Sequence, residues 1–141
     1  PHPYAEKDAV FWINSANEGF ANHSQYTFAI RLKTTNEFVG GIGLKVEQAF
    51  DRASLGYWIA EPFWNKGYAT EATKGILKFG FEQLNLNKIY ATHLIENPAS
   101  GKVMTKNGMI KEGELIDHFK RDGIYRSVLQ YRLTKKEYQT S

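Results

Sequence analysis

The stretch GYWIAEPFWNKGYATEA, residues 56–72, passes from the alternation of a β-strand to the spacing of an α-helix through a loop. The loop ends in Lys66 and Gly67, directly before the expected start of the helix. The first N–H groups of a helix have no partner within the helix, and the helix dipole favours an anion beside them. Gly67 and the small Ala69 leave room for a ligand, and Lys66 adds a positive charge. The stretch therefore predicts a binding site for a pyrophosphate group.

Two common phosphate-binding motifs do not fit this loop. A P-loop needs a second glycine and a Lys-Ser or Lys-Thr ending, and a dinucleotide-binding fingerprint needs three glycines, whereas Gly67 stands alone. A single Lys-Gly pair before a helix is more often an ordinary connection between a strand and a helix. The assignment of a pyrophosphate site therefore depends on what the rest of the chain contains.

The spacing of apolar residues outside this stretch predicts an α+β domain with a mixed sheet. Helices are expected over residues 5–15, 69–84 and 98–107, and strands over residues 26–32, 38–47, 53–60, 88–95, 109–119 and 125–133. Glycines interrupt the second of these strands, which is therefore expected to be flattened or bulged. The length of 141 residues predicts a single domain, residues 1–141.

The composition excludes several kinds of site. The chain has no cysteine, so disulfides, thiolate metal sites and a cysteine nucleophile are excluded, and a cytoplasmic protein is expected. No apolar run is long enough to span a bilayer, so no membrane partner is expected. The net charge of +3 suits either a mildly basic protein or one that binds an anionic ligand. Because no nucleic-acid-binding motif or Arg-rich tract is present, a nucleic-acid partner is not expected.

A second motif follows the strand expected at residues 88–95. Asn97-Pro98-Ala99-Ser100 opens a helix, and Lys106-Asn107-Gly108-Met109 and Glu112-Gly113 come after it. In their order and spacing, the two motifs resemble the GNAT superfamily of N-acetyltransferases, in the branch of the RimJ/RimL N-terminal acetyltransferases. The resemblance covers almost the whole chain, roughly residues 3–133.

The match to the family is close but has departures. The family pattern in the loop is Arg/Gln-x-x-Gly-x-Gly/Ala, and its last two fixed positions are matched by Gly67 and Ala69. Trp64 stands at the Arg/Gln position, which is usual in the RimJ/RimL-like branch. That branch commonly reads Tyr-Trp-Ile and then Trp-Gly-Lys-Gly-Tyr-Ala-Thr-Glu-Ala, from which this chain differs by Asn65 in place of glycine. In the second motif, Asn107 replaces a usually apolar residue.

The resemblance implies a GNAT fold, in which two parallel strands, here residues 53–60 and 88–95, splay apart to hold acetyl-CoA as the acyl donor. No metal is expected. The residues implied in binding acetyl-CoA are Trp58, Ile59, Ala60, Trp64, Asn65, Lys66, Gly67, Tyr68, Ala69, Thr70, Asn97 and Ser100. The family normally begins with a further strand and helix, which are expected to be absent from this chain.

The resemblance also implies transfer of an acetyl group to a primary amine, on a protein or peptide N-terminus or a small amine, by direct attack on the thioester. Many family members assist the leaving thiolate with a tyrosine seven residues after the motif asparagine, where this chain has Met104. The branch points instead to Ser100, although a serine there could equally cap or pack its helix.

The amine must also lose a proton to a base. The candidates are Glu61, Glu96, Asp117 and His118, and Glu61 and His118 are taken with Ser100 as the catalytic set. For each of these groups taken alone, a solvated surface charge is the more common role. His93 lies within an expected strand and is interpreted as structural.

Two other readings stay open. A GNAT-fold protein could bind acyl-CoA without turnover, which the methionine at position 104 mildly favours, and a basic nucleic-acid module is disfavoured by the loop motif. The acceptor cannot be carried over from the family, because Arg126 and Ser127 stand near a position where relatives often have an acidic residue. The last strand, around Tyr131, could support a homodimer.

Overall fold

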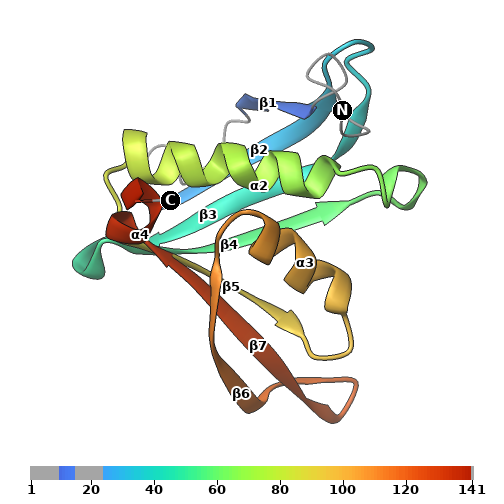
Figure 1. The fold of residues 1–141 in the computed structure, drawn as a ribbon. Coiled ribbons are helices and arrows are strands. Elements are labelled where there is room, and N and C mark those ends of the chain that lie inside the picture. The colour runs from blue at the N-terminus through green and yellow to red at the C-terminus, as the bar shows by residue number, and fades with distance from the viewer. Residues whose placement is uncertain (1–9, 15–23, 141) are drawn as a thin grey trace.

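The computed structural model describes residues 10–14 and 24–140, which form one mixed sheet with helices packed on it (Figure 1). The sheet has seven strands in the order β1-β2-β3-β4-β5-β7-β6. Every neighbouring pair is antiparallel except β4 and β5, which run parallel. The strands are β1 Val10–Asn14, β2 Gln25–Leu32, β3 Phe38–Glu47, β4 Arg52–Ile59, β5 Lys88–Leu94, β6 Ile110–Arg121 and β7 Ile124–Thr134.

The helices follow the strands that they cover. Helix α2 (Tyr68–Lys78) comes after β4 and continues into the π-helical turn η4 (Phe79–Gln83), and α3 (Pro98–Lys106) comes after β5. Helix α2 contacts β1, β3 and β4, whereas α3 contacts β5. The shorter elements are η2 (Gln48–Phe50), η3 (Glu61–Phe63) and α4 (Lys135–Thr140).

Alternation along the strands divides their side chains between the two faces of the sheet. Tyr26 and Leu44, paired across β2 and β3, are buried on the face that α2 and η4 cover. There the ring of Phe79 meets the ring of Tyr26 edge-on, with centroids 5.5 Å apart. The next pair, Thr27 and Gly43, points away from the helices. The hydrophobic core therefore lies on the face that α2 and η4 cover, and the side chains of the other face are available to line a binding site.

The parallel pair β4 and β5 is joined only at one end. Its register consists of the pairs Arg52↔Lys88, Ala53↔Ile89 and Ser54↔Tyr90. Each strand nevertheless stays paired with its other neighbour over its whole length, β4 with β3 and β5 with β7. The two strands consequently diverge beyond Ser54 and Tyr90, as a splayed pair.

Hydrogen bonds across three strands hold the closed end of this pair. The carboxylate of Glu47, at the end of β3, accepts hydrogen bonds from Arg52 Nη2 at 2.8 Å and from the Tyr90 hydroxyl at 2.6 Å. The hydrogen bond from Arg52 is the main cause that lowers the pKa of Glu47. This polar link joins β3, β4 and β5 at the point where the parallel pairing begins.

Most of the predicted elements are confirmed. The strands agree with those expected to within two residues at most ends, the bulge expected in β3 lies where Ile30 pairs with Gly40 but Arg31 with Phe38, and the splayed parallel pair is present. The helix expected at residues 69–84 is present, but its last part is the π-helical turn η4.

The helix expected at residues 5–15 is wrong where the structure describes it. Residues 10–14 form the strand β1, which pairs antiparallel with β2 from Val10↔Leu32 to Asn14↔Phe28, and the remaining residues of that range lie outside the described part. A short apolar run does not distinguish a helix from a strand, and the edge of β2 offers backbone groups that only a strand can pair. Helix α4, with 6 residues, was not predicted.

In residues 10–14 and 24–140, no helix is both long enough and apolar enough to cross a lipid bilayer.

We expect Gly80→Ala to destabilise the fold. A Cβ atom on Gly80 would lie 2.6 Å from Ile89 Cδ1 and 3.2 Å from Leu44 Cδ1, inside the core between η4 and the sheet. Overpacking of this kind typically costs about 1–3 kcal/mol of unfolding free energy, measurable by urea denaturation. Gly113→Ala is the control, because a Cβ there meets nothing within 4 Å. An equal effect of the two substitutions would contradict close packing at Gly80.

Glu137 should make stability depend on acid pH. Hydrogen bonds from Arg132, and from the backbone N–H of Thr134, lower the pKa of Glu137 to about 2. A carboxylate whose pKa is depressed on folding stabilises the protein above its unfolded pKa of about 4.3, and this contribution is lost as the pH falls through the folded pKa. Glu137→Gln should therefore lower the thermal midpoint at neutral pH, and the difference from wild type should shrink from about pH 4.5 to pH 2.

The matched control is Glu114→Gln, at an exposed glutamate on the neighbouring strand β6. Thermal unfolding of the three proteins across this pH range tests the assignment. A Glu137→Gln difference that persists unchanged at about pH 2 would show that the carboxylate is not the source.

Candidate functional site

The loop between β4 and α2 is fixed by backbone conformation and by one indole. Asn65 and Gly67 have φ angles of 61° and 81°, in the left-handed region that asparagine and glycine tolerate best. The Trp64 indole N–H donates to the carbonyl of Ile59 at 2.7 Å and so joins the loop to the end of β4. The asparagine at position 65 therefore meets the same conformational requirement that a glycine would.

Gly67 leads directly into an uncapped helix start. Gly67 is the N-cap of α2 and offers no side-chain cap, and the first helical hydrogen bond runs from Glu71 N–H to Gly67 C=O at 3.1 Å. The N–H groups of Tyr68, Ala69 and Thr70 consequently have no partner within the helix. With the exposed Lys66 beside them, these groups suit an anionic ligand.

Asn107 ties the end of α3 to this helix start. Its Nδ2 atom donates to the carbonyl of Thr70 at 3.2 Å and to that of Val103 at 2.9 Å. The residue that departs from the usual apolar character at this position thus connects the two helices. We expect the connection to help hold the first turn of α2 in place.

The first turn of α3 carries a serine that accepts two hydrogen bonds. Ser100 Oγ accepts from the Tyr57 hydroxyl of β4 at 3.3 Å and from Asn97 Nδ2 at 3.2 Å. A serine hydroxyl has two acceptor lone pairs and one proton. With Tyr57 and Asn97 both as donors, the Ser100 proton is left for another acceptor. Ser100 and Asn97 are among the residues predicted from the sequence, but the Tyr57 side chain is not, because strand alternation indicates burial and not the partner of a hydroxyl.

On its other side, the same turn rests on β5 and β7. A Cβ on Gly101 would lie 3.0 Å from the Tyr131 hydroxyl and 3.1 Å from His93 Nε2, so the glycine permits an unusually close approach. His93 is buried, stacks on Tyr131 with ring centroids 5.6 Å apart, and places Nδ1 2.7 Å from the carbonyl of Leu94. Since a carbonyl can only accept, Nδ1 carries the proton. The contacts agree with a structural role for His93.

The first turn of α3 therefore bridges the splayed strands, with Ser100 bonded toward β4 and Gly101 packed on β5 and β7. Met104, where many family members have a tyrosine, is 2% exposed and belongs to the core. Position 104 consequently contributes nothing polar to the gap between the strands.

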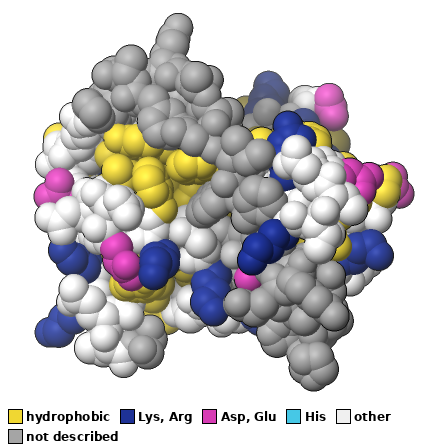
Figure 2. Space-filling view, turned by 90° about the horizontal axis from the view of Figure 1, so that it is seen from above, with side chains coloured by type: hydrophobic (Ala, Val, Ile, Leu, Met, Phe, Trp, Pro, Cys, Tyr) yellow, Lys and Arg dark blue, Asp and Glu magenta, His cyan; other side chains and the backbone are white. Residues whose placement is uncertain are grey.

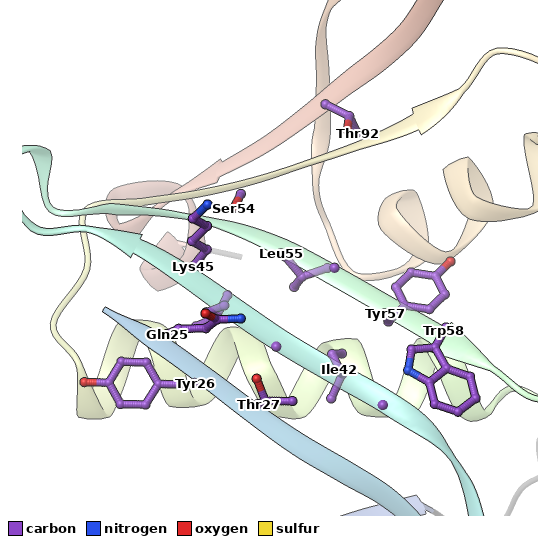
Figure 3. A pocket seen from close by; sticks show the side chains of 14 residues that line it. Gln25, Tyr26, Thr27, Ile42, Lys45, Ser54, Leu55, Tyr57, Trp58 and Thr92 are labelled. Carbon is purple, nitrogen blue, oxygen red and sulfur yellow. The ribbon is translucent and has the colours of Figure 1, made fainter. Parts of the chain in front are cut away.

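A cavity of about 450 Å³ opens beside this gap (Figure 3). Its lining comes from β2, β3 and β4, and Thr92 contributes from β5 on the far side of the gap. A Cβ on Gly41 would lie 2.8 Å from Trp58 Nε1, which places the indole over β3 on the face away from α2. Polar lining side chains are Gln25, Thr27, Lys45, Ser54 and Thr92.

The backbone expected to bind the acyl donor is partly engaged. The N–H of Ala60 donates to the carbonyl of Val39 at 2.8 Å, and the carbonyl of Ile59 accepts from Trp64. The Ala60 N–H and the Ile59 carbonyl thus hold the end of β4 in place, and both already have a hydrogen-bond partner within the protein.

The proposed bases lie apart from Ser100 in the hydrogen-bond network. Glu61 is exposed in η3, and His118 is exposed on β6, which β7 separates from β5. Among the described residues, no hydrogen bond or ion pair connects either side chain to Ser100. Of the other candidates, Glu96 lies 3.7 Å from Arg126 in a partly exposed ion pair. Asp117, at φ 49°, donates its N–H to Ser127 Oγ at 2.9 Å.

The surface charge is mixed rather than gathered into one basic patch on the face shown in Figure 2. There, Lys and Arg side chains are spread among acidic and neutral ones, and the largest group of hydrophobic side chains lies at the upper left of the view. In the described part of the chain, no three His, Asp or Glu side chains come together in a way that could hold a metal ion.

Comparison with known proteins gives consistent matches. The family model for the acetyltransferase (GNAT) domain matches residues 1–110. The uncharacterized N-acetyltransferase p20 of Bacillus licheniformis is 37% identical over 134 residues, which cover 94% of this chain and 73% of p20. YdaF of Bacillus subtilis (strain 168), provisionally named a ribosomal N-acetyltransferase, is 31% identical over 94 residues. That match covers 67% of this chain, but the chain spans only about half of YdaF, 51%.

A solved structure agrees in fold. A chimera of the spermidine N-acetyltransferase SpeG from Vibrio cholerae and hSSAT superposes with a TM-score of 0.81. The superposition covers 89% of this chain and 75% of the chimera, at 24% sequence identity.

Gly67→Ala should weaken the binding of CoA. A left-handed φ costs a residue with a Cβ about 1–2 kcal/mol, so alanine should shift the backbone and misdirect the N–H groups of Tyr68 and Ala69. We expect an affinity loss of about tenfold in titration calorimetry, which corresponds to about 1.4 kcal/mol. Gly123→Ala, with φ of 77° in the β6–β7 turn, imposes the same strain elsewhere and should leave the affinity unchanged. Similar affinities of the two variants for CoA would contradict the assignment of the start of α2 as a CoA-binding site.

Proposed function

This chain belongs to the GNAT family of N-acetyltransferases, and from that premise we propose that it transfers the acetyl group of acetyl-CoA to a primary amine by direct attack on the thioester. The observation that carries the proposal is the Ser100 hydroxyl. Its oxygen is hydrogen-bonded to Tyr57 and Asn97, and it lies where α3 bridges the splayed strands.

The uncapped start of α2 supports a role in holding the acyl donor. The pyrophosphate would be bound by the N–H groups of Gly67, Tyr68, Ala69 and Thr70 and by the charge of Lys66, and Trp64 and Asn65 would shape the loop. The pantetheine arm would lie in the gap between β4 and β5, along the backbone of Trp58, Ile59 and Ala60. The side-chain oxygen of Asn97 would accept from it, since Nδ2 is already bonded to Ser100.

The groups around the gap supply the chemistry. The Ser100 O–H would donate to the sulfur as negative charge develops there, which stabilises charge in the transition state more than in the ground state. Glu61 or His118 would accept the proton of the amine, directly or through water. The available proton on Ser100 favours turnover over binding of acyl-CoA without reaction.

The acceptor would approach from the cavity beside the gap. Of the described lining residues none is acidic, whereas Lys45 is basic. A polycation such as spermidine would meet repulsion there, so this charge favours a peptide or protein N-terminus, or a small uncharged amine, in keeping with the RimJ/RimL-like branch. A polyamine remains the second candidate, because the fold is shared with a spermidine N-acetyltransferase.

The first test is a thermal-shift titration with acetyl-CoA, CoA and desulfo-CoA. A ligand that binds only the folded state raises stability by about 2.7 kcal/mol at a hundred times its Kd. All three should stabilise the protein, and thiol release should then be seen with peptides that have a free N-terminus and be weaker with spermidine. The absence of any shift at millimolar ligand would overturn the proposal.

Ser100→Ala should lower kcat by about tenfold or more, because a hydrogen bond to a charged group is lost in the transition state. The Kd for acetyl-CoA should change little, since the pyrophosphate contacts remain. The control is Thr105→Ala on the same helix, which removes a hydroxyl bonded to the carbonyl of Lys102. Steady-state kinetics with equal kcat for wild type and Ser100→Ala would remove Ser100 from the mechanism.

A further inference from the structure

We propose that Tyr57 is a positioning residue for the transfer step: its hydroxyl holds and polarises Ser100 so that the serine proton is directed at the sulfur of the acyl donor. The inference rests on the proposed function. Many family members assist the leaving thiolate with a tyrosine at the position of Met104 on α3. Here a tyrosine of the strand β4 would assist it through Ser100.

The geometry places Tyr57 at the edge of the gap. It lies on β4 beyond Ser54, where the parallel pairing has ended, and it lines the cavity. Its hydroxyl reaches Ser100, 43 residues farther along the chain, at 3.3 Å. Figure 3 shows the ring beside α3, while the neighbouring Trp58 lies toward β3. The hydroxyl thus crosses from β4 to the helix that bridges the splayed strands.

We take the Tyr57 hydroxyl as the donor in this contact, in the same direction as Asn97 Nδ2. With Asn97 Nδ2 and the Tyr57 hydroxyl both donating to Ser100 Oγ, the only remaining hydrogen-bonding capacity of the serine is its own proton. Hydrogen bonds in a chain polarise one another, so donation into Oγ makes the serine O–H a stronger donor. Without Tyr57, one lone pair would be open and the hydroxyl could rotate to other partners.

Burial keeps Tyr57 in its donating form. Burial raises the pKa of Tyr57 above the ordinary value of a tyrosine. The phenol therefore stays protonated throughout the neutral and mildly alkaline range. Because residue 104 is a methionine, no competing hydroxyl comes from the position where many family members have a tyrosine.

Tyr57 neither gains nor loses a proton in the transfer step. The amine nitrogen forms the C–N bond as the C–S bond breaks, and the electron pair of the broken bond stays on sulfur. Ser100 O–H donates a hydrogen bond to that sulfur and retains its proton, as does Tyr57. The nitrogen loses one proton to water or a base, and the sulfur later gains one from water, which gives the amide and the free thiol.

The test uses Tyr57→Phe, which keeps the ring and removes the hydroxyl, with Tyr138→Phe as control. Tyr138 also loses a hydroxyl bonded at 2.7 Å, to Glu82, but it lies on α4. The first readout is the pKa of the CoA thiol bound to each protein, followed by the ultraviolet absorbance of the thiolate. Wild type and Tyr138→Phe should depress this pKa relative to free CoA. In Tyr57→Phe it should rise by about one unit, the size expected for one lost hydrogen bond to a charged group.

The second readout separates kcat from KM. Tyr57→Phe should lower kcat by roughly fivefold to tenfold with the KM for acetyl-CoA little changed, and it should add almost nothing to the defect of Ser100→Ala, because the two act as one unit. A ring-fluorinated tyrosine at position 57 keeps the shape and donates more strongly, so it should lower the bound thiol pKa further; it carries the test if Tyr57→Phe does not fold.

The outcomes separate the two proposals. An unchanged thiol pKa and additive kinetic defects in Tyr57→Phe, with a wild type that transfers acetyl groups, would overturn the role of Tyr57 alone. A wild type that binds no CoA would overturn the proposed function and this inference with it.

Discussion

The short parallel pairing of β4 and β5 is the constraint on which the rest of the site depends. β4 is hydrogen-bonded to β3, and β5 to β7, over the full length of each strand. When β4 and β5 diverge, only the backbone hydrogen bonds between these two strands are lost. The closed end is held by the link from Glu47 to Arg52 and Tyr90, on the face away from the helices. A splay that opened from the start of both strands would lose this link. The gap is therefore a stable property of the sheet and does not need a ligand to open it.

The helices convert this gap into a place for chemistry. The first turn of α3 spans the gap and contacts the strands on both sides. Ser100 is hydrogen-bonded to Tyr57 of β4 through its hydroxyl. Gly101, which has no side chain, packs closely against His93 of β5 and Tyr131 of β7. Asn107 then fixes the far end of α3 to the start of α2. A shift of α3 would consequently displace both the Ser100 hydroxyl and the uncapped N–H groups at the start of α2.

Much of this arrangement could be predicted from the sequence, and what could not has identifiable causes. Alternation and helical spacing located the long strands and α2, and the loop motif located Gly67. The strand β1 was misassigned because a short apolar run carries no decisive period. Helix α4 was missed although Thr134 and Glu137 form a reciprocal capping box, a signal present in the sequence as Thr-x-x-Glu. The contact between Tyr57 and Ser100 could not be predicted, because the two residues are 43 positions apart in the sequence.

The departures from the family pattern are explained by the conformation that each position requires. Asn65 stands where glycine is usual and adopts a left-handed φ, which asparagine tolerates better than other residues with a Cβ. Trp64 provides an indole N–H that closes the loop onto Ile59. Asn107 exchanges an apolar contact for a hydrogen bond to Thr70. In each case the backbone requirement is met by different chemistry. A pattern of residue types is therefore a weaker description of this site than the backbone geometry that those residues produce.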